Sequence, residues 1–239
     1  MCGRYVAPDD AAMERYWELK RPGSPFKDLH NQPAFARVNY NTCPTQMVPV
    51  ERIGPNGPEI VAMRWGMDRI DRATGEIAPR KLNNARVEGY KRVPPFAEAW
   101  KNGRRGIQLV MGYYEWMGTE DGRKVPFYIR PDDQGETFGL AALWSEAADG
   151  SGLLTCTHIT MPPNGVIAKI HDRMPAILRA EDHEAWLSGT PEQAAACLKP
   201  YPDQHTVLRR VGKRVNATKN NDAGLIEEDI DPSGAASQD

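Results

Sequence analysis

Glycine and proline divide the whole of this sequence into short segments. Its 239 residues include 21 glycines and 20 prolines, spread along the chain rather than gathered in one linker. These residues favour turns, and the segments between them are rich in β-branched, aromatic and aliphatic side chains. Strands are therefore expected over residues 46–50, 59–65, 106–116, 126–129, 137–144 and 153–160.

Helical patterns are fewer and lie mostly outside this series of strands. Asp9 or Asp10 can cap a helix that continues to about Lys20. Further helices are expected over residues 165–170, 181–187 and 192–198, with Asn164 as the cap of the first of these three. Many short strands with peripheral helices predict a single α+β domain with a curved antiparallel sheet or β-barrel-like core.

Several classes of protein are excluded by simple features of the sequence. No apolar run approaches the roughly 18 to 20 residues that a membrane span needs, and the first residues lack the apolar stretch of a signal peptide. A cytoplasmic protein is therefore expected. The cysteines, at positions 2, 43, 156 and 197, form no Cys-x-x-Cys pair, which argues against a zinc ribbon or a disulfide scaffold. We expect no metal and no cofactor, and any cysteine chemistry has to come from a single thiol.

The formal net charge of −2 hides a split along the chain. Residues 222–239 hold six acids and no Lys or Arg, so the rest of the chain has a net charge of +4. Its basic residues gather in residues 80–105 and 207–221. Clustered cations can neutralise nucleic-acid phosphates, and a solvated cationic face is the simpler alternative. We expect a globular domain over residues 1–226 and an acidic disordered tail over residues 227–239.

Cys2 follows the initiator methionine directly. Removal of Met1 would leave an N-terminal cysteine, in which an amine with a pKa near 8 and a thiol with a pKa near 8.5 lie on adjacent carbons. The amine of such a 1,2-aminothiol condenses with an aldehyde to a Schiff base, and the sulfur then closes a thiazolidine ring. N-terminal nucleophile hydrolases use cysteine differently, with the amine as the base. A cysteine at position 2 alone is weak evidence for either reaction.

Three further polar residues stand in places that are awkward for purely structural use. Glu115 lies within an apolar run, where a carboxylate is costly unless it is paired or acts as an acid or base. His171 directly follows a helical segment and could serve as a general acid. Asn84 opens the first basic stretch. Each has a structural alternative: an outward-facing strand residue, a helix cap and a turn residue, respectively.

These pieces together resemble one family, the SOS-response-associated peptidases, also called abasic-site processing proteins. The resemblance extends to about Ile226. It rests on Met1-Cys2-Gly3-Arg4-Tyr5, Tyr40-Asn41-x-x-Pro44, Arg64-Trp65-Gly66, Asn84-Ala85-Arg86-Val87-Glu88, Gly112-Tyr-Tyr-Glu115-Trp116, Thr160, Ile170-His171-Asp-Arg173-Met-Pro175, and Val215-Asn216 with Lys219-Asn220. It implies a single α+β domain with a β-barrel-like core and an N-terminal cysteine in a positively charged DNA-binding cleft.

The resemblance also implies a role for each candidate catalytic residue. Cys2, freed of Met1 by self-processing or by an aminopeptidase, would form a thiazolidine with the ring-opened aldehyde of an abasic site in single-stranded DNA. The crosslink would shield the lesion during the DNA-damage response, with lyase activity as a further expectation. Asn84 would hold the Cys2 terminus and the sugar, Glu115 would act as the acid/base, and His171 would engage the sugar or phosphate.

The same resemblance predicts the surroundings of the reaction. The residues expected to line the DNA channel are Arg4, Asn41, Arg86 and Arg173. A monomer acting in the cytoplasm at the nucleoid is expected, with abasic single-stranded DNA as its partner and no membrane association.

The sequence departs from the family pattern after Gly66. Family members usually continue with a proline and one or two aromatic residues that wedge against DNA bases, whereas residues 67–75 here contain no aromatic side chain. Because stacking on an aromatic ring contributes roughly 1 to 3 kcal/mol per base, affinity or junction preference could differ. Cys43 is a second oddity, and a simple structural cysteine is its plainer interpretation.

Two other functions remain open at this point. Cys2, His171 and Glu115 could form the nucleophile, base and orienting group of an amide hydrolase acting on a peptide or small amide. Alternatively, the basic stretches could make a nucleic-acid binding module with no chemistry at Cys2. Hydrolysis would give turnover, aldehyde capture would stop near one adduct per protein, and simple binding would survive loss of Cys2.

Overall fold

A computed structural model describes residues 2–27, 29, 33–71, 73–78 and 81–229. Its helices are α1 (Asp10–Lys20), α2 (Phe96–Lys101), α3 (His183–Ser188) and α4 (Pro191–Ala196). Its strands are β1 (Tyr5–Ala7), β2 (Asn39–Thr42), β3 (Met47–Gly54), β4 (Gly57–Trp65), β5 (Asn84–Arg86), β6 (Arg105–Val110), β7 (Gly112–Gly118), β8 (Lys124–Pro131), β9 (Phe138–Glu146), β10 (Leu154–Met161), β11 (Met174–Pro175), β12 (Ile177–Leu178) and β13 (Thr206–Arg210).

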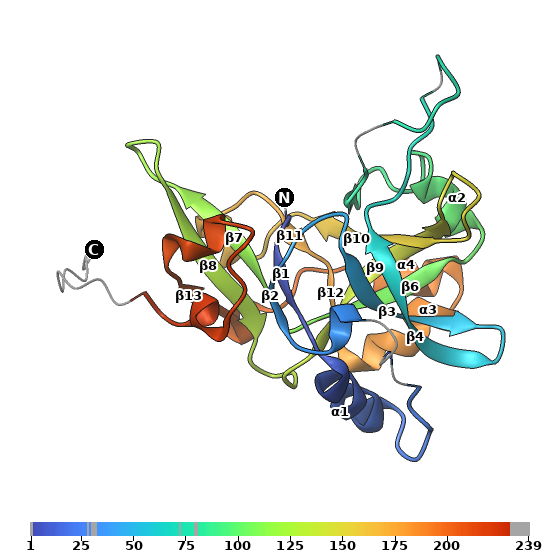
Figure 1. The fold of residues 1–239 in the computed structure, drawn as a ribbon, viewed down its shortest axis with the longest axis horizontal. Coiled ribbons are helices and arrows are strands. Elements are labelled where there is room, and N and C mark those ends of the chain that lie inside the picture. The colour runs from blue at the N-terminus through green and yellow to red at the C-terminus, as the bar shows by residue number, and fades with distance from the viewer. Residues whose placement is uncertain (1, 28, 30–32, 72, 79–80, 230–239) are drawn as a thin grey trace.

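The strands form two sheets that meet at the N-terminal strand. One sheet has the order β13-β8-β7-β1-β2, and the other contains the path β10-β4-β3-β6-β9. Because β10 pairs with both β4 and β9, this path closes into a ring. In Figure 1 the first sheet lies to the left of β1 and the ring to the right, with α1 below. The expected α+β domain with a barrel-like core is confirmed.

Two details of the predicted fold are wrong. The sheets are not wholly antiparallel, because β10 runs parallel to β4 and to β5. Residues 106–116 were expected to form one strand, but they form β6 and β7, which belong to different sheets. Gly112 begins the second strand at a close approach, since a Cβ there would lie 2.3 Å from the ring of Tyr128.

Helix α1 begins at the cap that the local sequence predicts, and long-range aromatic packing joins the two sheets. The Asp9 carboxylate accepts a hydrogen bond of 2.9 Å from the amide of Ala12, which confirms the expected start of α1. Tyr5 of the first sheet packs against Trp65 of the ring, with ring centroids 5.0 Å apart. Both side chains are fully buried, so the N-terminal strand is fixed in the core rather than laid on the surface.

The C-terminal segment packs on the outer side of the first sheet. Val211, Val215 and Leu225 are buried there with Tyr114 and Tyr128. Beyond the expected domain boundary at residue 226, Glu228 still forms a bridge with Val211, so the paired segment continues to about Asp229. The rest of the predicted acidic tail, residues 230–239, lies outside the described residues.

Among the described residues, no helix is both long enough and apolar enough to cross a membrane.

Candidate active site

Pairing of β1 with β7 brings Cys2 and Glu115 together. Tyr5 lies opposite Tyr113, and the amide of Tyr114 donates to the carbonyl of Arg4 over 2.9 Å. Because the strands are antiparallel, continuing this register towards the N-terminus brings Cys2 to the Glu115 end of β7. The Cys2 side chain is only 1% exposed. Burial, reinforced by the nearby Glu115 carboxylate, raises the pKa of the Cys2 thiol, so the thiol is protonated at neutral pH.

Glu115 and His171 place a carboxyl group and an imidazole side by side, near this thiol. The His171 Nε2 atom lies 3.5 Å from a carboxylate oxygen of Glu115. His171 Nδ1 lies 3.0 Å from the backbone amide of Arg173, 3.2 Å from the Arg173 carbonyl oxygen and 3.1 Å from a carboxylate oxygen of Asp172. Burial raises the pKa of Glu115 to about 7. Burial also lowers the pKa of His171, so the imidazole is neutral at physiological pH.

The second sheet supplies Asn84 and a histidine that sequence reasoning missed. Asn84 of β5 lies opposite His158 of β10. His158 is fully buried against the backbone of Cys2, and burial lowers its pKa to about 3. The buried Oδ1 atom of Asn84 accepts no hydrogen bond from the described part of the chain. The Asn84 oxygen is therefore available to a donor from the N-terminus or from a bound ligand.

A cavity of about 400 Å³ opens over Glu115 and His171. The other residues that line it are Arg4, Trp116, Lys124 and Asn216. Trp116 donates from its indole nitrogen to Asn216 Oδ1 over 2.8 Å, and the Arg4 guanidinium lies 5.7 Å from the centre of an indole ring. Sequence reasoning assigned no site role to Trp116, Lys124 or Asn216. Trp116 and Asn216 were signalled only as members of the motifs that carry the family resemblance.

The four residues predicted to line a DNA channel have different environments. Arg4 donates to Asn41 Oδ1 and to the carbonyl of Val215, each over 2.7 Å. Asn41 is 2% exposed and donates to backbone carbonyls of the C-terminal segment, so in this structure it holds that segment in place. Arg173 forms a two-pronged ion pair with Glu88. Arg86 is exposed and lines a second, neighbouring cavity.

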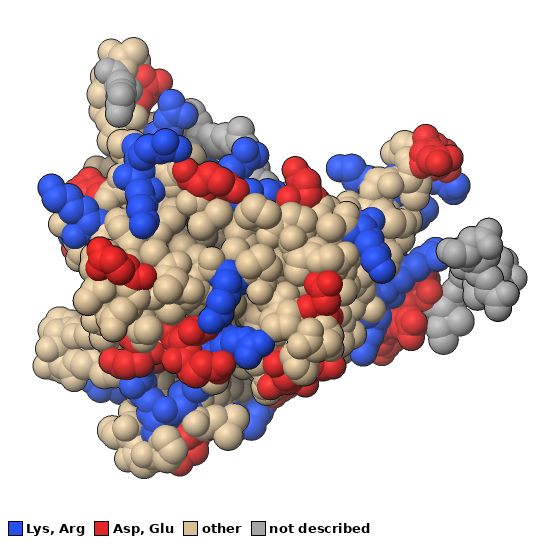
Figure 2. Space-filling model, turned by 180° about the vertical axis from the view of Figure 1, so that it is seen from behind, with Lys and Arg blue, Asp and Glu red and all other residues tan. Residues whose placement is uncertain are grey.

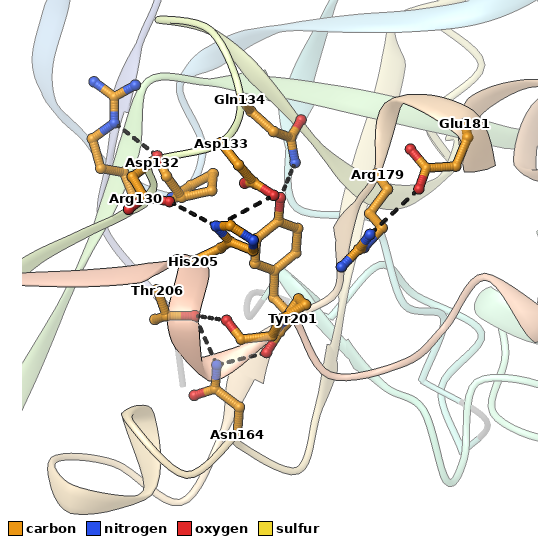
Figure 3. Close-up of polar contacts among 12 residues, drawn as sticks. Arg130, Asp132, Asp133, Gln134, Asn164, Arg179, Glu181, Tyr201, His205 and Thr206 are labelled. Carbon is orange, nitrogen blue, oxygen red and sulfur yellow. Dashed lines mark hydrogen bonds and ion pairs between the residues drawn. The ribbon is translucent and has the colours of Figure 1, made fainter.

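The turn that leads to His171 is anchored by Asn164. Its Oδ1 atom accepts from the amide of Ile167 over 2.9 Å, as the predicted cap requires. Its Nδ2 group donates to the Tyr201 carbonyl and to the Thr206 hydroxyl, so the turn is tied to the chain before β13 (Figure 3). His171 in turn bonds to Ile167 through its own amide. Asn164 therefore helps to fix where His171 stands.

Within the described residues, one group could offer three ligands to a metal ion. It consists of Asp132, Asp133 and His205, which lie close together beside Tyr201 (Figure 3). The His205 Nδ1 atom lies 3.0 Å from Asp132 Oδ1, and Tyr201 donates to Asp133, so these groups already satisfy one another. None of the three lines the cavity over Glu115.

The arrangement around Cys2 contains a thiol, a carboxyl group next to an imidazole, and the cationic side chains of Arg4 and Lys124.

Comparison with known proteins places this geometry in context. A family model described as SOS response associated peptidase (SRAP) matches residues 1–218. The "Abasic site processing protein YoqW" of Bacillus subtilis is 32% identical over 195 residues, covering 79% of this chain and 85% of that protein. The "Abasic site processing protein HMCES" of Xenopus tropicalis is 26% identical over 258 residues, covering 92% and 76%.

Solved structures share the fold. A crystal structure of a Bacteroides thetaiotaomicron protein superposes with a TM-score of 0.78 at 23% identity, covering 95% of this chain and 99% of that one. A Bordetella bronchiseptica protein gives a TM-score of 0.70 at 23% identity, covering 88% and 100%.

Proposed function

The chain belongs to the SOS response associated peptidase (SRAP) family, and from that premise we propose that it processes abasic sites in single-stranded DNA by bonding covalently to them through Cys2. The names of its relatives, abasic site processing proteins, support the first part of this proposal. The second part rests on one observation: a cysteine at position 2 lies beside a carboxyl group whose pKa is raised to about 7.

The reaction requires that Met1 be removed first, by hydrolysis of the peptide bond between Met1 and Cys2. The freed amine of Cys2 then attacks the aldehyde carbon of the ring-opened deoxyribose. Loss of one water gives an imine, and addition of the Cys2 sulfur to the imine carbon closes a thiazolidine as the thiol proton passes to the nitrogen. Overall, one aminothiol and one aldehyde give one thiazolidine and one water.

Glu115 is suited to the proton transfers in this sequence. A carboxyl group with a pKa of about 7 is partly protonated near neutral pH, so it can give a proton to the departing hydroxyl and later take the proton of the thiol. The His171 Nε2 atom lies 3.5 Å from the Glu115 carboxylate, so the imidazole can hold that group in place. We assign Asn84 to holding the Cys2 terminus and the sugar.

Cations on both sides of the site fit a DNA strand. Arg4 and Lys124 line the cavity over Glu115, and Arg86 lines the neighbouring cavity. Contacts of such residues with phosphates release counterions, so binding of the strand weakens as salt rises. An unpaired strand is proposed as the substrate because the thiol is buried at the junction of two sheets, where a stacked and paired base step cannot reach it.

Incubation with excess single-stranded oligonucleotide containing one abasic site tests this function. We expect a heat-stable adduct on a denaturing gel whose yield stops near one per protein. An intact single strand and an intact duplex serve as controls and give no adduct, because they offer no aldehyde. Release of many product molecules from a peptide or small amide, without an adduct, would instead support a Cys2-dependent amide hydrolase.

Deleting residues 227–239 should leave adduct formation unchanged or make it faster at low salt. The deletion removes acidic residues, including Asp229, which lies 3.6 Å from Arg210 in the second basic stretch. Arg210 is then free to attract phosphates, and the gain should disappear at high salt because the attraction is screened. Rates measured across a salt series provide the check, and a large loss of adduct at every salt concentration would contradict it.

A further inference from the structure

Cys2 lies before the point at which β1 joins its sheet. The amide of Tyr114 donates to the carbonyl of Arg4, but in the described part of the chain neither Cys2 nor Gly3 bonds to another backbone group. Removal of Met1 makes Cys2 the last residue of this unpaired end. Its amine and its thiol must nevertheless reach one aldehyde carbon, so another part of the structure has to hold residue 2 in place.

A buried histidine approaches residue 2 from the other sheet. His158 of β10 is fully buried and lies against the Cys2 backbone. It lies opposite Asn84 of β5, so the two side chains point to the same face of the sheet. The imidazole packs on the indole of Trp65 with ring centroids 5.3 Å apart, and this indole donates to the carbonyl of Asn83 over 2.8 Å. The orientation of the His158 ring is therefore fixed by its surroundings.

Two more buried polar side chains lie behind His158. The amide oxygen of Gln108 lies 3.3 Å from His158 Nδ1, and the hydroxyl of Tyr5 faces the Gln108 amide in turn. All three side chains are fully buried, and they come from β1, β6 and β10. Tyr5, Gln108 and His158 thus form a buried polar row that ends against the backbone of Cys2.

The buried polar row carries no charge. Burial lowers the pKa of His158 to about 3 and raises the pKa of Tyr5 well above its usual value, so both are neutral near pH 7. Charged side chains of both signs are instead spread over the outside, as the rear face in Figure 2 shows. Neutral polar groups in a core still weaken the fold unless they are hydrogen-bonded, and apolar side chains would fill the same space at less cost. A use other than packing is therefore indicated.

Three atoms of the buried polar row show how its members can be connected. Tyr5 Oη, Gln108 Nε2 and His158 Nε2 have no hydrogen-bond partner within the described residues. The two ends of a side-chain amide have nearly the same shape, so the Gln108 amide fits the same space with its nitrogen and oxygen exchanged. This exchange gives a partner to both Gln108 and Tyr5, and it places the ring proton of His158 on Nε2, towards Cys2.

We propose that the buried polar row holds the carbonyl group of Cys2 and so positions the amine and the thiol for attack on the aldehyde. The Tyr5 hydroxyl donates to the Gln108 oxygen, and the Gln108 nitrogen donates to His158 Nδ1. His158 Nε2 then donates to the Cys2 carbonyl. His158 acts through Cys2 and not on the DNA, so it is a positioning residue. The inference rests on the proposed function, because it takes Cys2 to be the nucleophile.

Rates and affinities of His158 variants test this role. His158→Leu should slow adduct formation with an abasic single strand by up to about 100-fold, the effect of a misplacement of about 1 Å. Affinity for a strand with tetrahydrofuran in place of the abasic sugar should be unchanged, since no contact with DNA is lost. His158→Gln should recover most of the rate, because the glutamine nitrogen reaches about as far as Nε2 and can donate to the same carbonyl.

A double variant separates positioning from packing. Gln108→Leu alone should slow the reaction, but it should add nothing in the His158→Leu background, because Gln108 acts only through the His158 ring. The double variant should have a Tm equal to or above that of the wild type, since both polar partners are replaced together by apolar groups. A purely structural role would give the reverse result, a lower Tm with an unchanged rate.

His183→Leu is the matched control. His183 is also a buried histidine whose pKa is lowered by burial to about 3, but it lies 3.2 Å from the Tyr16 hydroxyl of α1, outside the cavity over Glu115. The control should form the adduct at the wild-type rate. Tyr5→Phe removes a single oxygen atom at the far end of the row, so it tests the inference even if His158→Leu does not fold. It should slow the reaction, and this loss should vanish in the Gln108→Leu background.

Four outcomes would overturn the inference. They are a wild-type rate in both His158→Leu and Tyr5→Phe, no recovery in His158→Gln, additive losses in the double variant, or equal slowing in His183→Leu. Failure of the proposed function is a separate result, because it would appear as the absence of any adduct with the wild-type protein.

Discussion

Cys2→Ala should yield no heat-stable adduct with an abasic strand. The variant keeps an N-terminal amine after Met1 is removed, so it can still form an imine, but it has no sulfur to close the thiazolidine ring. An imine hydrolyses on heating, so denaturing gels after heating should show no crosslinked band above that of a reaction without protein. Noncovalent binding of the strand should remain, since Cys2 contributes no charge to it.

Cys2→Ser and a second cysteine variant make this prediction specific. Serine keeps the amine, and borohydride should trap its imine, but its hydroxyl is a poor substitute for sulfur in closing a durable ring. Cys43→Ser is the matched control, because Cys43 is a partly exposed thiol on the loop after β2. It should crosslink at the wild-type rate. A heat-stable adduct formed by Cys2→Ala at that rate would mean that another nucleophile, such as a lysine, is responsible.

Glu115→Gln should slow adduct formation by about 100- to 10,000-fold, the usual range for loss of a positioned acid/base group. Glutamine has nearly the same shape but transfers no proton, so affinity for the single strand should change little. Protonation of the Cys2 amine slows wild type and variant alike. The ratio of the wild-type rate to the variant rate, taken at each pH, therefore removes this shared effect. Because the acid form of Glu115 is lost above a pKa of about 7, this ratio should fall as the pH rises through that value.

Stability measurements separate this catalytic effect from damage to the fold. The pKa of Glu115 is raised from 4.5 to about 7 in the folded protein, so folding favours its neutral form. This contribution to stability is fully present below pH 4.5 and is lost as the pH rises through about 7. Glutamine does not titrate, so relative to Glu115→Gln the wild type should become less stable over that window. A variant that is unfolded at every pH, or a rate ratio that does not change with pH, would contradict the assignment.

Local sequence predicted those parts of the fold that local interactions decide. The caps at Asp9 and Asn164 both formed where expected, because each is a hydrogen bond between residues three apart in sequence. The helix expected over residues 165–170 is only a three-residue 3-10 turn, Ile167–Lys169. The break between β6 and β7 could not be seen in the same way. It depends on the ring of Tyr128 packing over Gly112, a contact between strands that no local pattern encodes.

The candidate site also contains residues that the sequence alone indicates and residues that only strand pairing reveals. Glu115 stood out in the sequence because a carboxyl group in an apolar run demands an explanation, and it is indeed buried, at 3% exposed. His158 gave no such signal, since its place opposite Asn84 arises from the register of β10 with β5. Lys124 likewise reaches the cavity only through the pairing of β8 with β7. Residues of this kind become visible only once strand pairing is known.

Intact-protein mass spectrometry, before and after incubation with a single strand that contains one abasic site, tests the central claim most directly. Before incubation, the mass should equal that of the chain without Met1. Afterwards it should equal the sum of that chain and the strand minus one water, and it should stay unchanged after borohydride treatment because a thiazolidine has no imine to reduce. An adduct that still contains Met1, or one that gains two hydrogens with borohydride, would contradict thiazolidine formation at Cys2.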